Sequence, residues 1–264
     1  MSAQNSAEQT PGAGGHGGGR EDRQVHVLQL YPRDMNIYGD YGNALVVQRR
    51  LEWLGYEPVM HTYDPGDEFP EQVDIIIGGG GQDSGQDKIH ADLLQQGERL
   101  RSMVEDGVPM LMICGLYQLF GHSFETREGQ RIEGIGALDV TTRGTDNRLI
   151  GNVVARSEEF GEIIGYENHS GQTYLGSGVR PLGTVTKGEG NNEQDDHEGA
   201  RYKNVVGSYL HGSMLPKNPA VADFLISTAL QRRFGEDLSP EAVAERIDDT
   251  LTEQARTTAA KRPR

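Results

Sequence analysis

Short apolar runs alternate with longer amphipathic stretches over the first half of the chain, and this alternation constrains the fold most. Four runs are predicted strands, namely VHVLQLYP from residue 25, EPVMHTY from residue 57, VDIIIGGGG from residue 73 and VPMLMIC from residue 108. Residues 41–56 and 89–107 carry apolar side chains at near-helical spacing. Strands separated by helices of this length form βαβ units, so the sequence predicts an α/β domain with a parallel sheet.

The flanking segments and the second half have a different character. Residues 1–24 are rich in Gly, Gln, Glu and Ser and predict a disordered tail. Turn-rich sequence from residue 134 to 203 predicts antiparallel strands and exposed loops. NVVGSYLHG at 204–212 predicts a buried strand, and 218–235 an amphipathic helix. Residues 236–264 predict one further helix that ends in a basic tail.

The charge and cysteine content exclude several classes of protein. The net charge of −15 and the pI near 4.9 argue against nucleic acid or an anionic membrane as the main partner. No apolar run approaches the roughly 18 residues of a membrane span, so no membrane insertion is expected. The N-terminus does not resemble a secretory signal. A single cysteine is compatible with a reducing, cytoplasmic setting.

That cysteine, Cys114, lies where a predicted strand passes into a predicted helix. The apolar run 110–113 precedes it, and Leu116, Leu119 and Phe120 follow at helical spacing. The N–H groups and positive dipole end of a helix N-terminus favour a thiolate, so a nucleophile is one interpretation. Free cysteines are also commonly buried in cores, and this stretch alone leaves both interpretations open.

A thiol nucleophile needs a base, usually histidine, which can lie far away in the sequence. Of the eight histidines, His169 in YENHSGQ and His211 in SYLHGSMLP are the candidates. His211 follows the apolar run 205–210, so it too lies at a predicted strand end. Alone it would more often be a packed histidine. Active sites of parallel sheets lie beyond the carboxyl ends of the strands, so Cys114 and His211 together favour a catalytic pair.

Two further features have weaker implications by themselves. The glycines at 78–81 do not form a phosphate-binding loop, because no Lys-Ser or Lys-Thr pair completes the G-x-x-x-x-G frame. Glycines at a strand end can instead direct backbone N–H groups at an oxyanion. Arg148 in DNRLIGN is, by itself, more typical of an ordinary surface arginine. No cysteine pair or H-E-x-x-H motif predicts a metal site.

Six motifs occur in an order that indicates a family. They are MNIYGDYGN, IIIGGGG, ICGLYQLFG, TDNRLIGN, YENHSGQTYLG and YLHGSMLPKNP. Together they resemble class I glutamine amidotransferases of the cobyric-acid-synthase-like (CobB/CobQ-type) branch. Within that branch the chain is most similar to the amidotransferase subunits of lipid II isoglutaminyl synthases. The resemblance covers roughly residues 25–235.

This resemblance implies a fold and a set of site residues. The fold would be α/β and flavodoxin-like, with a largely parallel central sheet flanked by helices and residues 25–235 as the amidotransferase domain. Cys114 would be the nucleophile and His211 its base. Arg148 would bind the α-carboxylate of L-glutamine through a charge-assisted bond. The oxyanion hole would be formed by Gly79, Gly80 and Gly115.

The chain departs from the family pattern at two positions. Many class I amidotransferases have a glutamate two residues after the histidine, whereas this chain has Ser213. The residue that orients His211 is therefore open, with Glu167 and Asp40 as candidates. Leu116 replaces the second glycine of C-G-G-Y-Q, and its β-carbon could narrow the site without removing the chemistry.

The resemblance also implies a reaction shared between two chains. This chain would hydrolyse L-glutamine to glutamate and ammonia through a cysteine thioester. A separate Mur-ligase-like (MurT-type) synthetase subunit would use the ammonia to amidate the D-glutamate α-carboxyl of the lipid II stem peptide, in peptidoglycan synthesis. ATP and any metal would belong to that partner, so no cofactor is expected here. The expected location is the bacterial cytoplasm.

Three other functions stay open at this point. The chain could be an amidotransferase of another pathway, such as cobyric acid synthesis, although those usually carry a fused synthetase domain. It could be a cysteine hydrolase or peptidase on a similar sheet, which would ignore glutamine. It could also be a scaffold without activity, but intact Cys114 and His211 argue against this.

Overall fold

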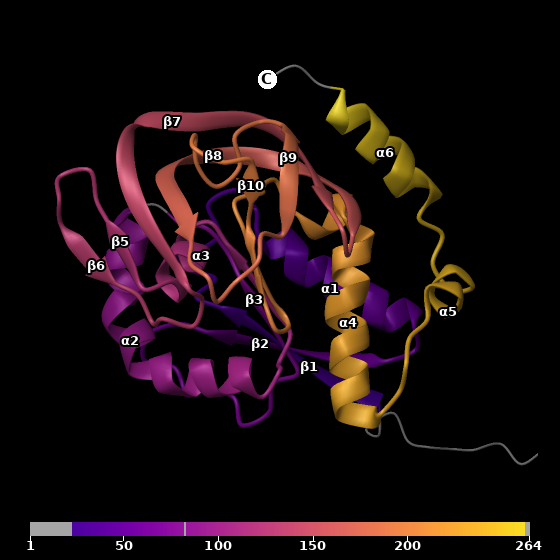
Figure 1. Ribbon diagram of the computed structural model, residues 1–264. Coiled ribbons are helices and arrows are strands. Elements are labelled where there is room, and N and C mark those ends of the chain that lie inside the picture. Colours follow the sequence, from indigo (N-terminus) through magenta and orange to yellow (C-terminus); the bar gives the residue numbers. More distant parts are fainter. Residues whose placement is uncertain (1–22, 82, 262–264) are drawn as a thin grey trace, which may run out of the picture.

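The computed structural model describes residues 23–81 and 83–261. The predicted disordered tail, residues 1–24, therefore lies outside the described residues except for its last two. In the described part, helices and strands form two sheets with helices packed around the larger one (Figure 1). No helix among the described residues is both long and apolar enough to cross a membrane.

The larger sheet contains all four strands predicted in the first half. Its strand order is β11-β12-β4-β3-β1-β2, and every neighbouring pair is parallel except β11 and β12. The side chains of β3 and β4 are all buried, as their continuous apolar sequences require. The strands are β1 (Gln24–Leu30), β2 (Glu57–Tyr63), β3 (Ile75–Gly78), β4 (Met110–Ile113), β11 (Ala200–Tyr202) and β12 (Val205–Ser208).

Helices cover both faces of this sheet. The chain passes from β1 to β2 through α1 in one direction and from β3 to β4 through α2 in the other. Right-handed crossovers therefore place α1 and α2 on opposite faces. Helix α1 packs against α4, and α2 packs against the short α3. The helices are α1 (Tyr41–Trp53), α2 (Asp83–Glu105), α3 (Gly115–Phe120) and α4 (Pro219–Phe234).

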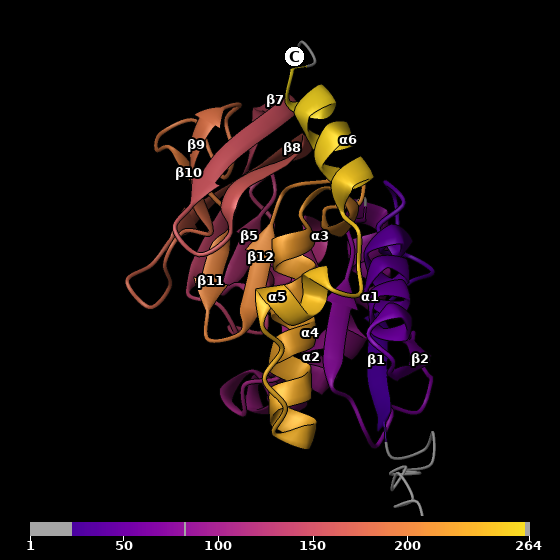
Figure 2. The same cartoon turned by 90° about the vertical axis from the view of Figure 1, so that its right-hand side faces the viewer.

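The smaller sheet is mostly antiparallel, as the turn-rich second half predicts. The strands β7 and β8 pair along most of their length, with an irregularity between Gly144 and Leu149. In Figures 1 and 2 these two strands arch over one end of the molecule. The strands are β5 (Ser123–Glu125), β6 (Arg131–Glu133), β7 (Val140–Ser157), β8 (Gly161–Leu175), β9 (Gly183–Lys187) and β10 (His197–Glu198).

The C-terminal segment differs from the single predicted helix. A one-turn helix η2 (Leu215–Lys217) precedes α4, and two separate helices follow it, α5 (Pro240–Ala244) and α6 (Thr250–Ala260). The buried Arg50 explains the interruption, because its guanidinium binds the carboxylates of both Asp223 and Asp249. Asp249 is thereby held at the start of α6, which runs along the outside of the molecule (Figure 2).

Candidate active site

Cys114 occupies a tight turn between β4 and α3, as predicted. Its backbone has φ 50° and ψ −103°, a region that non-glycine residues rarely adopt and that recurs at functional sites. The turn is held on both sides, because the Cys114 N–H donates to Ser208 O and its carbonyl accepts from Gln118 N. The side chain is only 7% exposed. Helix α3 begins directly after this turn, at Gly115.

His211 and Cys114 converge on one glycine. A β-carbon on Gly80 would lie 2.7 Å from His211 Cε1 and 3.0 Å from Cys114 Cβ. His211 is fully buried, and its backbone N–H donates to the carbonyl of Tyr166 on β8. Its ring also lies 4.4 Å from the ring of Tyr38, centroid to centroid. The two predicted catalytic residues therefore meet at the carboxyl edge of the sheet.

The charge state of His211 follows from its neighbours. Burial disfavours the imidazolium, but the Cys114 thiolate and the Asp40 carboxylate outweigh that cost and raise the pKa of His211 to about 10. Asp40 Oδ1 lies 3.7 Å from His211 Nδ1, which is within ion-pair range and longer than a hydrogen bond. The influence of Asp40 is therefore mainly one of charge. The arrangement favours the imidazolium form of His211.

Of the two candidates for orienting His211, the structure favours Asp40. Asp40 is 2% exposed, and its Oδ2 accepts the Gly80 N–H at 2.7 Å, which fixes the carboxylate toward His211. Glu167 is also buried, but it accepts backbone N–H groups from Glu189 and Gly190 in a different loop. Sequence spacing alone could not separate the two.

We expect Asp40→Asn to lower kcat for glutamine hydrolysis, the reaction implied by the sequence resemblance, by about 10- to 100-fold. This is the range typical of proton-transfer defects. In the glutamine hydrolysis that the sequence resemblance implies, the His211 imidazolium would protonate the departing nitrogen, so wild-type activity should fall as pH rises through about 10, the pKa of His211. Without the carboxylate charge this pKa is lower, so the decline should begin at lower pH. A kcat–pH profile measures the shift.

Glu167→Gln provides the matched comparison, because it also neutralises a buried carboxylate but not the one beside His211. In Glu167→Gln, the decline of kcat at alkaline pH should occur at the same pH as in the wild type. An unchanged alkaline limb in Asp40→Asn would show that Asp40 does not act on His211.

A polar pocket of about 390 Å³ opens beside Cys114. Arg148, on β7, lines it, and its Nε donates to Asn168 Oδ1 at 2.7 Å. That bond fixes the guanidinium of an otherwise exposed side chain at the pocket, where it can bind a carboxylate. The other lining residues are Ile37, Tyr38, Gly81, Ser84, Gln86, Gln118, Phe124, His169, Ser170 and Gly171. None of these lining residues is acidic.

The glycine loop differs in detail from the expected oxyanion hole. The Gly80 N–H donates to Asp40, so it is committed to orienting the carboxylate. Gly81, one residue later, lines the pocket with Cys114. Gly115, the first residue of α3, has no helical partner for its N–H and stays a candidate donor. We therefore assign Gly80 a spatial role, since only a residue without a β-carbon fits between Cys114 and His211.

A chain of hydrogen bonds connects two glutamines of the pocket lining to Tyr209 and Thr173. Gln86 Nε2 donates to Gln118 Oε1, and Gln118 Nε2 donates to the hydroxyl of Tyr209. Tyr209 in turn contacts Thr173 Oγ1 at 2.7 Å. His169 stacks on Tyr209, with 3.6 Å between ring centroids, and burial lowers the pKa of His169 to about 3. His169 is therefore a neutral part of the pocket wall, which leaves His211 as the candidate base.

A buried carboxylate, Glu198 on β10, holds the strand end that leads to His211. Its Oε1 accepts from Ser208 Oγ and from Tyr209 N, and burial raises its pKa to about 7. The folded protein therefore keeps a proton on Glu198 that an unfolded chain would release near the ordinary value of 4.5.

We expect Glu198→Gln to change the pH dependence of stability in a defined direction. In the wild type, the contribution of Glu198 to the free energy of unfolding should fall as pH rises from about 4.5 to 7, because only the folded state binds this proton. The full shift corresponds to roughly 3 kcal/mol. The lowered pKa of His169 contributes in the opposite direction in both proteins, because there only the unfolded state binds the proton. Glutamine stays neutral, so the free energy of unfolding at pH 8 minus that at pH 5 should be more positive in Glu198→Gln than in the wild type. Urea unfolding at pH 5 and pH 8 measures it, with the exposed Glu162→Gln as control, and equal slopes in all three proteins would contradict the assignment.

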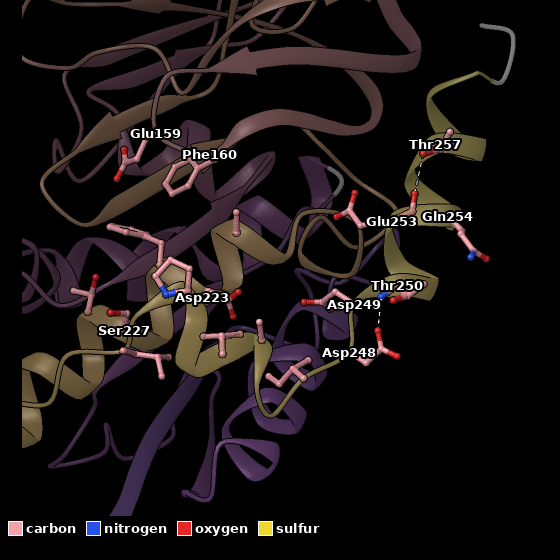
Figure 3. Close-up of a pocket in the computed structure, with 18 residues that line it drawn as sticks. Glu159, Phe160, Asp223, Ser227, Asp248, Asp249, Thr250, Glu253, Gln254 and Thr257 are labelled. Atoms are coloured by element: carbon pink, nitrogen blue, oxygen red, sulfur yellow. Dashed lines mark hydrogen bonds between the residues drawn. The ribbon is translucent and has the colours of Figure 1, made fainter.

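A larger hollow of about 1080 Å³ lies away from this site, between α4 and the C-terminal segment (Figure 3). Phe160, Asp223 and Glu253 are among its lining residues, which include no cysteine and no histidine. The larger hollow therefore lacks the residues that a cysteine-based reaction needs, and the smaller pocket is the candidate active site.

Comparisons with known proteins show which family this chain resembles. The family described as "CobB/CobQ-like glutamine amidotransferase domain" matches residues 26–219. The lipid II isoglutaminyl synthase (glutamine-hydrolyzing) subunit GatD of Streptococcus pneumoniae is 38% identical over 88% of this chain and 90% of that relative. The same subunit of Staphylococcus aureus is 40% identical over 79% of this chain and 87% of the relative.

More distant matches share the domain and the fold. A probable cobyric acid synthase of Methanothermobacter thermautotrophicus is 28% identical over 89% of this chain and 50% of its own length. A crystal structure of a glutamine amidotransferase aligns with a TM-score of 0.55 at 17% identity, over 76% of this chain and 98% of that one. A second amidotransferase structure, from Thermotoga maritima, aligns with a TM-score of 0.51 at 14% identity, over 90% and 92%. These structures indicate a shared fold.

Proposed function

The chain belongs to the CobB/CobQ-like glutamine amidotransferase family, and we propose that it is the glutaminase subunit of a lipid II isoglutaminyl synthase. The observation that carries the proposal is the convergence of Cys114 and His211 at Gly80, beside a pocket that presents Arg148. The similarity to GatD subunits over most of both chains supports the assignment to this pathway.

In the proposed reaction, Arg148 binds the α-carboxylate of L-glutamine and the Cys114 thiolate attacks the side-chain amide carbon. The negative charge that develops on the amide oxygen is stabilised by backbone N–H groups, for which Gly81 and Gly115 are the candidates. The His211 imidazolium gives its proton to the nitrogen as the carbon–nitrogen bond breaks, and ammonia leaves. A γ-glutamyl thioester remains on Cys114.

The second half of the reaction reverses the role of His211. Now neutral, it takes a proton from water as the water oxygen attacks the thioester carbonyl. The carbon–sulfur bond breaks, glutamate leaves, and the Cys114 thiolate beside the His211 imidazolium is restored. The carboxylate of Asp40 stabilises that imidazolium at both ends of the cycle.

The ammonia would be used by a partner. The relatives are named as subunits of a glutamine-hydrolyzing synthase, so we propose a heterodimer with a Mur-ligase-like (MurT-type) subunit. That subunit would hold ATP, any metal and lipid II, and would amidate the D-glutamate α-carboxyl of the stem peptide. Because the reaction consumes ATP, we propose that it takes place in the cytoplasm.

The test is glutamate release from L-glutamine by the purified chain, alone and with a co-expressed Mur-ligase-like partner. We expect a stable complex, faster release in its presence, and ATP-dependent amidation of lipid II detected by mass spectrometry. Release of glutamate without amidation of lipid II would refute the pathway and retain the glutaminase. Amidation of a corrinoid instead would favour the cobyric acid alternative.

Two results would refute the glutaminase itself. Cleavage of ester or peptide substrates with no glutamate release would identify a hydrolase of another class. Absence of any hydrolysis by folded protein, with or without the partner, would favour a scaffold.

A further inference from the structure

A buried side-chain amide in the pocket beside Cys114 has an oxygen atom without a hydrogen-bond partner among the described residues. Gln86, near the start of α2, is 2% exposed and lines the pocket with Cys114 and Arg148. Its Oε1 has no hydrogen-bond partner among the described residues. An acceptor buried without a partner costs free energy, so it marks a place where a ligand could donate.

The orientation of this amide is fixed by the chain of hydrogen bonds beneath it. Gln86 Nε2 donates to Gln118 Oε1 at 2.9 Å, and Gln118 Nε2 donates to Tyr209 at 3.0 Å. Both ends of the Gln118 amide thus have hydrogen-bond partners, whereas Gln86 Oε1 has none among the described residues. A β-carbon on Gly115 would lie 2.8 Å from Gln86 Nε2, so the amide lies beside the residue that follows the nucleophile.

One other buried side-chain atom of the pocket lining lacks a partner among the described residues, and it is less suited to this role. His169 Nε2 also lacks a partner among the described residues, but its ring lies flat on Tyr209 and is held through Nδ1 by Gly171 O. Asn168 Oδ1 is already occupied by Arg148. Gln86 Oε1 is therefore a buried side-chain acceptor of the pocket lining that is fixed in position and has no partner among the described residues.

We propose that Gln86 Oε1 accepts a hydrogen bond from the α-ammonium group of the substrate. The inference rests on the proposed glutaminase function, in which Arg148 binds the α-carboxylate, backbone N–H groups bind the amide oxygen and His211 serves the amide nitrogen. The α-ammonium is the one group of L-glutamine left without a partner. Since none of the lining residues is acidic, a neutral acceptor must bind it.

The test compares L-glutamine with glutaramate, which has the same carboxylate and amide but no α-ammonium group. Gln86→Met removes the acceptor while keeping a similar volume. In the full complex we expect kcat/KM for L-glutamine to fall roughly 10- to 100-fold, the value of a hydrogen bond to a charged group. The Ki of glutaramate as a competitive inhibitor should change less than about threefold, because it never made this contact.

Gln95→Met, an exposed glutamine on the same helix, is the control and should change neither constant. If Gln86→Met weakens glutaramate as much as L-glutamine, Gln86 only supports the pocket and the inference is wrong. If it weakens neither, the contact does not exist. These two outcomes count against the inference only if the wild-type protein hydrolyses L-glutamine. A wild-type protein that does not hydrolyse L-glutamine would refute the proposed function instead.

Discussion

Replacement of Cys114 by alanine is expected to abolish glutamine hydrolysis, with kcat reduced by about 10⁴-fold or more, as for other covalent nucleophiles. The thioester cannot form without the thiol, and Cys114 is the only cysteine in the chain. Glutamate release measured by a coupled enzymatic assay gives the loss. The fold should be retained, because alanine also has a β-carbon and only the sulfur is removed from the turn.

Ammonium salts provide the control for this variant. In the complex with the Mur-ligase-like partner, free ammonia should bypass this subunit, so ammonium-dependent amidation should persist in Cys114→Ala. Loss of both activities would indicate that the substitution disturbs the complex. Glutamate release above about a tenth of the wild-type rate would exclude the thioester mechanism, since even a hundredfold loss is small for a removed nucleophile.

The positions of Cys114 and His211 could be predicted because active-site residues of parallel sheets lie at the carboxyl ends of the strands. Each residue follows an apolar strand, and the carboxyl ends of parallel strands meet at one edge. The strands β4 and β12 are neighbours in the sheet, so residues 97 positions apart become adjacent. Arg148 was different, because only the resemblance to a family distinguished it from a surface arginine.

The sequence could not assign the finer roles, because these depend on loop geometry. Asp40 lies in a loop after β1, and its choice over Glu167 depends on one hydrogen bond from Gly80. Gln118 could have been found, because it lies four residues after Cys114, one turn along the predicted helix. Gln86 has no such signal, since only the contact between α2 and α3 brings it to the pocket.

The C-terminal helix was mispredicted for a related reason. The helical pattern of residues 239–258 is continuous, but in the structure the chain leaves the helix between α5 and α6, where Asp249 pairs with Arg50, 199 residues earlier. Long-range ion pairs leave no local pattern in the sequence, whereas a helix is predicted from local spacing.

Gly80→Ala is expected to lower kcat for glutamine by about 100- to 1000-fold, since misplacing a catalytic group by about 1 Å can cost about 100-fold. The new β-carbon would lie 2.7 Å from His211 Cε1, so the ring must move. It has little room, because His211 is fully buried and packs against Tyr38. The same assay of glutamate release measures the effect.

Gly80→Ala tests the spacing between Cys114 and His211 without removing a hydrogen bond. Alanine keeps the backbone N–H that Gly80 donates to Asp40. The displaced imidazole should also lie farther from the thiolate, so its pKa should be less raised and the alkaline limb of kcat should move to lower pH. Gly97→Ala on α2 is the control, since its β-carbon would meet side chains at 3.2 Å or more. A Gly80→Ala variant with wild-type kcat and an unmoved limb would mean that His211 and Cys114 do not need this spacing, and the proposed pair would then have to be abandoned.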